Sequence, residues 1–273
     1  MNEPVRIIAF GAHPDDCDIC IGGLAVKWAR AGARVKFVSL TNGDTGHFAM
    51  GGGPLARRRY AEAKASAAIA GIEYEVLDIH NGQLLPTLEN RWTVVRLIRE
   101  FCPDLVITNR PNDYHPDHRY ASQLVADAAY TVTIPNVQAL TPHLLVNPSV
   151  AYWRDDFKRP YPFTPDVAVA IDDVIETKLD MIACHESQVY EWLPYNQNKI
   201  DQVPADAEAR RIWMAGQYLP GMREEGERYR ELLVKLYGPE RAASIQYAEA
   251  LEFCEYGSPV TPEKFARLFP FFS

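Results

Sequence analysis

The sequence predicts an α/β protein with a Rossmann-like, doubly wound, mostly parallel sheet flanked by helices. Three observations predict this class. A continuous apolar run opens the chain, strand-like and helix-like segments then alternate, and polar clusters follow two of the strand-like segments. Such alternation is typical of parallel βαβ units. We expect a single domain over residues 1–273, with a core over about 5–190 and a C-terminal helical and loop elaboration over about 190–273.

The first half of the chain carries the clearest elements. Residues 5–12 (VRIIAFGA) are apolar throughout, which is typical of a strand buried on both faces. A helical pattern over 21–31 ends at Gly32, a residue well suited to stop a helix. The alternation continues with strands at 35–40, 74–78 and 105–108 and helices at 54–70 and 91–101. In a doubly wound sheet of order 3-2-1-4, the first and fourth of these strands are neighbours.

Beyond residue 130 the alternation weakens. Residues 131–149 look irregular, and the C-terminal part is rich in aromatic, proline and charged residues. The elements expected here are strands at 150–153 and 167–171 and helices at 177–183 and 224–237.

Composition excludes several classes of protein. The 273 residues are 47% hydrophobic and carry a formal net charge of −8, which argues for a sizeable core and against general nucleic-acid binding. No apolar run approaches the roughly 20 residues of a membrane-spanning helix. Five cysteines without a disulfide-rich spacing favour a reducing compartment. We therefore expect a cytoplasmic protein with no membrane or nucleic-acid partner.

A histidine and two carboxylates follow the first strand, in residues 12–18 (AHPDDCD). Ligands of open parallel sheets bind beyond the carboxyl ends of the strands. His13 and Asp16 are three positions apart, so a helical turn places them on one side, where both could bind a metal ion. Asp15 lies between them and stays free to act on a metal-bound water. The alternative is a turn in which an aspartate caps the next helix.

The fourth strand ends in a second cluster, residues 109–118 (NRPNDYHPDH). Because strands one and four are expected to be neighbours, His118 should approach His13. Two imidazoles and one carboxylate make three protein ligands, and catalytic zinc sites of this kind keep a fourth position open for water. Taken alone, HPDH also fits a helix N-terminus. Together the clusters predict one Zn²⁺ per chain, although iron or cobalt would also suit these ligands.

These motifs resemble the LmbE/PIG-L-type N-deacetylases, a family that includes enzymes acting on N-acetylglucosamine conjugates. The resemblance covers about residues 5–190 and depends chiefly on AHPDD and HPDH. Weaker support comes from residues 41–44 (TNGD), Arg59-x-x-Glu62, Lys178 and residues 185–188 (HESQ). Two features depart from the family: Asp18 stands where a glutamate is usual, and the stretch after about residue 190 is longer than in the smallest members.

The resemblance implies a role for each motif residue. Asp15 is implied as the general base, and His115 as a group that stabilises the oxyanion or protonates the leaving amine. Asp117 is implied to orient a neighbouring imidazole, and Arg59 to bind substrate. The implied zinc ligands are His13, Asp16 and His118.

Other polar and aromatic residues keep two interpretations. Asn42 and Asp44 follow the second strand at the same rim and are candidates for substrate binding, although Asn-Gly is also a strong turn signal. His47 lies in a glycine-rich segment that could form a lid, but we favour an exposed loop histidine. His185 could line the pocket or satisfy a core hydrogen bond. The aromatic segment 190–195 suits stacking on a sugar, but we favour packing.

These observations predict a hydrolase that removes an N-acyl group, in the first place acetyl, from an amino-sugar-type substrate through a zinc-bound water. The expected partner is a small N-acetylated, sugar-containing molecule, and the family's habit implies a homo-oligomer. Two alternatives remain. One is a hydrolase of another amide or an ester on the same metal site. The other is a non-catalytic module that binds a sugar or nucleotide.

Overall fold

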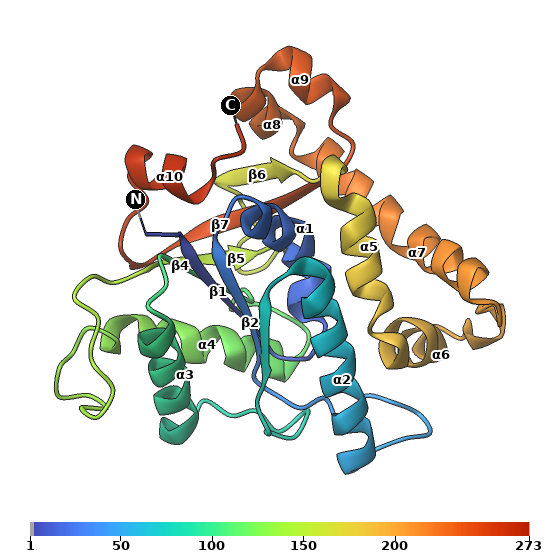
Figure 1. Ribbon diagram of the computed structural model, residues 1–273, viewed down its shortest axis with the longest axis horizontal. Coiled ribbons are helices and arrows are strands. Elements are labelled where there is room, and N and C mark those ends of the chain that lie inside the picture. The colour runs from blue at the N-terminus through green and yellow to red at the C-terminus, as the bar shows by residue number, and fades with distance from the viewer. Residues whose placement is uncertain (1–2, 273) are drawn as a thin grey trace.

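A seven-stranded sheet runs through the computed structural model, which describes residues 3–272 (Figure 1). The strand order is β3-β2-β1-β4-β5-β7-β6. The central strand β1 (Arg6–Gly11) lies parallel to β2 (Arg34–Ser39) on one side and to β4 (Leu105–Thr108) on the other. The predicted fold class and the order 3-2-1-4 are therefore confirmed.

Helices cover both faces of the sheet. Successive residues of β1 point to opposite sides, and since both sets are apolar, each face needs a cover of its own. Ile7 and Ala9 pack into a core with α1 (Asp16–Arg30), α2 (Gly52–Ala70) and α5 (Ile175–Ala183). Ile8 and Phe10 pack into a second core with α3 (Leu88–Phe101) and α4 (Pro116–Thr131) on the other face. Burial on both faces explains why the opening run is apolar throughout. The remaining predicted strands are β3 (Glu73–Val76), β5 (Ser149–Trp153) and β6 (Val167–Ala170).

Helix α1 begins at Asp16, earlier than the predicted start at residue 21. The prediction was wrong because the helix is kinked, with non-helical dihedral angles at Ile21. Glu249, from far along the chain, accepts hydrogen bonds from the backbone N–H groups of Gly23 (2.9 Å) and Leu24 (2.6 Å) just after the kink. Its carboxylate also meets buried Lys178 at 2.6 Å. Because the backbone N–H groups at the kink bond to a carboxylate far along the chain, the local sequence gives no sign of the kink.

The C-terminal part adds a strand as well as helices. Strand β7 (Ala248–Gly257), which the sequence did not predict, inserts between β5 and β6 and pairs antiparallel with both. The helix expected at 224–237 is two helices that meet at Tyr229. The other elements are η1 (Asp172–Val174), η2 (Ser187–Trp192), α6 (Leu193–Asn196), η3 (Ile200–Gln202), α7 (Ala207–Arg228), α8 (Arg230–Tyr237), α9 (Pro239–Ser244) and α10 (Pro262–Leu268).

Within residues 3–272, none of the helices combines the length and apolar character needed to cross a membrane. The expected cytoplasmic location and homo-oligomeric assembly stay predictions.

Candidate metal centre and active site

The chain turns sharply after β1, and glycine makes the turn possible. A Cβ on Gly11 would lie only 2.8 Å from the Cβ of Asp16, so the start of α1 can approach the strand end only without a side chain there. The Asp16 Oδ2 atom accepts hydrogen bonds from the backbone N–H groups of Ala12 (2.8 Å) and His13 (2.9 Å). These bonds fix the Asp16 carboxylate beside the His13 ring.

The second motif starts helix α4. His115 is the N-cap residue, and Pro116 follows at the first helical position, where proline is well tolerated. His118 therefore lies in the first turn of the helix. Because β1 and β4 are adjacent, this turn meets the end of β1, and His118 Nε2 lies 3.1 Å from His13 Nδ1.

Three potential ligand atoms form a compact triangle. His13 Nδ1 lies 3.6 Å from Asp16 Oδ2, which lies 3.5 Å from His118 Nε2, and 3.1 Å separates the two nitrogens. A tetrahedral zinc site with bonds of about 2.0–2.1 Å places its ligand atoms about 3.3 Å apart. The triangle therefore fits a metal ion of this kind.

His115 offers an alternative third ligand. Ligand atoms of His13, His115 and His118 all lie within 4.8 Å of one another, so these three side chains could also hold a metal ion. However, His115 Nδ1 already accepts a hydrogen bond from the Asp117 backbone N–H at 3.1 Å. The closer spacing of the Asp16 carboxylate makes it the better third ligand.

Carboxylates also face the outer nitrogens of both imidazoles. Asp117 Oδ2 lies 3.3 Å from His13 Nε2, and Asp113 Oδ2 lies 3.0 Å from His118 Nδ1. Metal-binding histidines typically have such partners, which orient the ring and raise its basicity. Asp117 thus contacts an imidazole as predicted. Asp113 was missed, although its place in the loop just before the helix that carries His118 was a usable signal.

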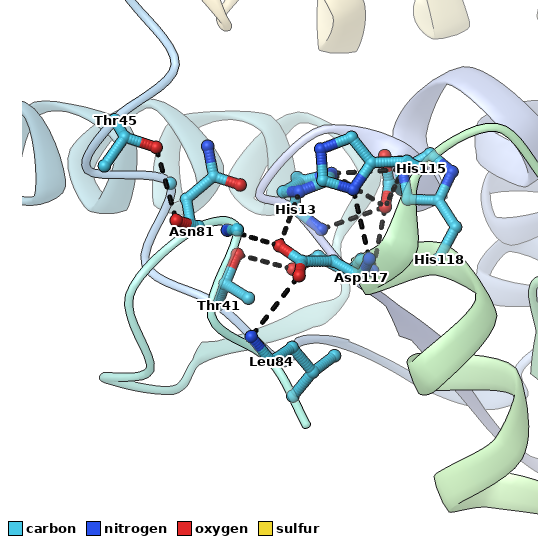
Figure 2. A network of polar contacts seen from close by, with 12 residues as sticks. His13, Thr41, Thr45, Asn81, Leu84, His115, Asp117 and His118 are labelled. Atoms are coloured by element: carbon cyan, nitrogen blue, oxygen red, sulfur yellow. Dashed lines mark hydrogen bonds and ion pairs between the residues drawn. The ribbon is translucent and has the colours of Figure 1, made fainter. Parts of the chain in front are cut away.

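Asp117 also ties the site to the loop that follows β3. Its buried carboxylate accepts hydrogen bonds from the backbone N–H groups of Gly82 (2.6 Å) and Leu84 (3.3 Å). Figure 2 shows this carboxylate between His13 and Leu84. The Asp117 side chain therefore connects three segments around the histidines: the turn after β1, the loop after β3 and the start of α4.

The electrostatic environment favours a cation between the two imidazoles. Burial would lower the pKa of His13, but Asp16 and a hydrogen bond with Asp117 raise it to about 9. Burial likewise opposes charge on His118, yet Asp16 and Asp113 raise its pKa. Carboxylates that hold a proton at these rings would hold a metal cation in the same way. By contrast, burial and the two neighbouring histidines lower the pKa of His115.

The predicted base, Asp15, is buried against an arginine. Arg59 Nη2 lies 3.0 Å from Asp15 Oδ1, and Arg59 Nη1 donates a hydrogen bond to the carbonyl oxygen of Gly43 at 3.4 Å. The Arg59 side chain is only 2% exposed. These contacts give Arg59 a role in positioning Asp15, and its predicted contact with substrate stays a prediction.

Asn42 and Asp44 connect two loops at the rim of the site. Asn42 Nδ2 donates to Asp78 Oδ1 at 2.9 Å, while Asn42 Oδ1 accepts from the Asp44 backbone N–H at 3.1 Å. Asp44 accepts a hydrogen bond from the Asn81 backbone N–H at 3.0 Å and pairs with His80 at 2.5 Å. Both predicted substrate-binding residues are thus buried and engaged within the chain, and substrate binding by them stays a prediction.

His185 lies in the core rather than on an open surface. It is fully buried, and its Nε2 atom lies 3.2 Å from Asp18 Oδ2. The Asp18 carboxylate also accepts a hydrogen bond from the Ser66 hydroxyl. Of the two interpretations left open by the sequence, the structure favours the core histidine, and it gives the unusual Asp18 a defined partner.

Comparisons with known proteins identify the family of this chain. The family model described as "PIG-L: GlcNAc-PI de-N-acetylase" matches residues 8–129, a range that includes both motifs. The diacetylchitobiose deacetylase of Thermococcus kodakarensis is 33% identical over an alignment of 211 residues that covers 71% of this chain and 76% of that protein. This chain belongs to the PIG-L deacetylase family.

Solved structures place this PIG-L family member in the same fold. The N,N′-diacetylchitobiose deacetylase from Pyrococcus horikoshii has a TM-score of 0.69 at 24% identity, covering 91% of this chain and 83% of that chain. The 4-carboxy-2-hydroxymuconate hydratase GalB from Pseudomonas putida has a TM-score of 0.72 at 19% identity, covering 93% and 98%. The second protein is named for a different reaction, so the fold alone does not fix the chemistry.

Replacing Asp113 by Asn in this PIG-L protein should weaken metal binding about 10–100-fold, because His118 would lose its charged partner. Competition with a chromophoric chelator would measure the affinity. Asp127→Asn is the matched control, since Asp127 lies on α4, the helix that carries His118, but pairs with Arg91 at 2.6 Å. Equal affinities for the Asp113 variant and the unmodified protein would contradict the assignment of Asp113.

Proposed function

We propose that this chain is a metal-dependent N-deacetylase that releases acetate from an N-acetylated amino sugar. The observation that carries the proposal is the triangle of His13, Asp16 and His118 beside the buried carboxylate of Asp15. The substrate class is supported by the matching family model and the Thermococcus relative, both named for removal of acetyl groups from sugar compounds.

We assign the metal ion to His13, Asp16 and His118, with zinc as the expected ion and iron or cobalt as alternatives. Asp117 and Asp113 hold the outer nitrogens of the two histidines. When bound at such a site, the ion polarises a carbonyl oxygen and lowers the pKa of water to about 7.

Asp15 is placed to move the protons of the reaction. Arg59 contacts Oδ1 of this carboxylate, so Oδ2 is the oxygen left to accept a proton. In the proposed reaction Asp15 takes a proton from the water whose oxygen adds to the acetyl carbon. The same proton then passes to the substrate nitrogen as the carbon–nitrogen bond breaks, which yields a free amine and acetic acid. The acid ionises to acetate at neutral pH by releasing its remaining proton to solvent. Positioned general acid–base groups contribute about 10²–10⁴-fold to a rate.

His115 is the proposed hydrogen-bond donor to the carbonyl oxygen, which gains negative charge as water adds. Because His115 Nδ1 accepts from the Asp117 backbone N–H, the neutral ring carries its hydrogen on Nε2. The ring lies beside both metal-ligand histidines, with centroid distances of 4.5 Å to His13 and 5.1 Å to His118. A positioned donor of this kind is typically worth about 3–4 kcal/mol.

Acetate release from a defined panel tests the proposal. The panel contains N-acetylglucosamine, N,N′-diacetylchitobiose, an N-acetylated alkyl amine and an acetate ester, each supplied to zinc-loaded protein. We expect acetate from the sugars, loss of activity after chelation and recovery on adding zinc. Faster hydrolysis of the ester would favour the alternative hydrolase, and metal binding without any hydrolysis would favour the non-catalytic module.

A further inference from the structure

Four rings form successive near-parallel contacts where the loop after β2 meets the C-terminal part of the chain. His47 stacks on Phe48 with centroids 4.6 Å apart, and Phe48 stacks on Tyr195 at 4.4 Å. Tyr195 in turn lies 6.1 Å from Trp192, at an interplanar angle of 18°. We call these four residues the aromatic wall.

The aromatic wall begins next to the reaction centre. A Cβ on Gly46, the residue before His47, would lie 3.5 Å from Arg59 Nη1, and Arg59 Nη2 contacts Asp15 at 3.0 Å. The same loop is tied to the β3 side of the site, because Thr45 Oγ1 donates to the carbonyl oxygen of Asn81 at 3.3 Å (Figure 2). The loop that carries His47 and Phe48 is therefore connected to the residues around Asp15.

The inner end of the wall is held rigidly. His47 Nε2 lies 2.7 Å from Glu191 Oε2, and His47 Nδ1 accepts hydrogen bonds from the backbone N–H groups of Ala49 and Met50. Arg58 clamps the same Glu191 with two hydrogen bonds of 2.8 and 2.6 Å. The His47 side chain is only 4% exposed, so the prediction of an exposed loop histidine was wrong.

The fold itself does not account for the outer rings. Phe48 is 46% exposed and Tyr195 is 47% exposed, so part of this stacked aromatic pair faces solvent. The neighbouring residues 187–192 form a π-helical turn, a rare conformation that occurs frequently at functional sites. Exposed apolar surface beside a reaction centre is typical of a ligand-binding groove.

We infer that Phe48 and Tyr195 bind the second sugar ring of an oligosaccharide whose first ring carries the reacting acetamido group. This inference rests on the proposed function and adds the size of the substrate. A pyranose ring has an apolar C–H face and a polar rim of hydroxyl groups. Because Phe48 and Tyr195 stack on each other, their exposed edges offer apolar contact to this face. The side chains of Arg58 and Glu191, 28% and 32% exposed, supply hydrogen-bonding groups for the rim. A lipid chain would make no use of those charges.

The test compares kcat/KM for N-acetylglucosamine and for N,N′-diacetylchitobiose. In Tyr195→Ala and in Phe48→Ala, we expect the value for the disaccharide to fall about tenfold and the value for the monosaccharide to change less than about twofold. Tyr195→Phe keeps the ring and should keep the preference. Tyr60→Ala is the matched control, because Tyr60 is 49% exposed on the outer side of α2. Equal losses on both substrates, or no loss on either, would overturn the inference.

Direct binding separates this inference from the proposed function. Trp192 lies next to Tyr195 in the wall and contributes to the tryptophan fluorescence of the protein. A change in that fluorescence should report binding of N,N′-diacetylchitobiose to zinc-loaded protein. If no sugar releases acetate but Tyr195→Ala weakens binding of N,N′-diacetylchitobiose, the proposed deacetylase activity is wrong and the sugar-binding role of the aromatic wall is kept. If acetate is released and the Tyr195→Ala protein binds and deacetylates N,N′-diacetylchitobiose like the unmodified protein, the sugar-binding role of the aromatic wall is wrong and the proposed deacetylase activity is kept.

Discussion

Replacing Asp15 by Asn should lower kcat by about 10²–10⁴-fold while the protein keeps its metal ion. Asparagine has nearly the same shape and keeps an oxygen that can face Arg59 Nη2, which lies 3.0 Å from Asp15 Oδ1. It cannot accept a proton from water at neutral pH, so only the chemical step is lost. Acetate release under saturating substrate, together with elemental analysis of the same sample, measures both properties.

A surface carboxylate supplies the control for this variant. Asp173 pairs with Lys27 at 2.7 Å and is largely exposed, so Asp173→Asn should keep full activity and full metal content. An Asp15→Asn protein with unchanged kcat would remove Asp15 from the chemistry. Loss of the metal ion in that variant would instead place Asp15 among the ligands, in the position assigned to Asp16.

The sequence was most informative where local pattern and topology agree. The apolar run at residues 5–12 indicated a buried strand, and the order of the strands then brought His13 and His118 together although they are far apart along the chain. Asp16 followed from its spacing to His13. These predictions depended only on the spacing of residues along the sequence and on the strand order of a doubly wound sheet.

Features that depend on distant partners were not predictable in this way. Strand β7 contains Glu249, which reads as a solvent-facing residue until its buried contacts with α1 and Lys178 are known. His47 likewise reads as an exposed loop residue, because its partner Glu191 lies in a π-helical turn from another part of the chain. In both cases a buried polar side chain is tolerated because of a partner that no local pattern reveals.

Replacing Asp16 by Ala should remove the metal ion, whereas His115→Ala should leave it bound. The geometry gives the reason for the difference. Asp16 Oδ2 lies 3.6 Å from His13 Nδ1 and 3.5 Å from His118 Nε2, close to the spacing of a tetrahedral site. His115 uses Nδ1 as the N-cap acceptor of α4 and is left to act on substrate through Nε2. Elemental analysis after dialysis against a weak chelator should find about one zinc per chain in the unmodified protein and in His115→Ala, and almost none in Asp16→Ala.

Two further readouts keep this comparison decisive. Asp16→Asn retains an oxygen that can accept from the Ala12 and His13 backbone N–H groups, so it should fold normally and still bind metal poorly for lack of charge. Thermal unfolding with and without zinc reports the same difference, because an ion that binds only the folded state raises Tm. Zinc should therefore raise the Tm of His115→Ala but not that of Asp16→Asn. The reverse result would assign the ion to the three histidines and would leave Asp16 as the group that shapes the turn after β1.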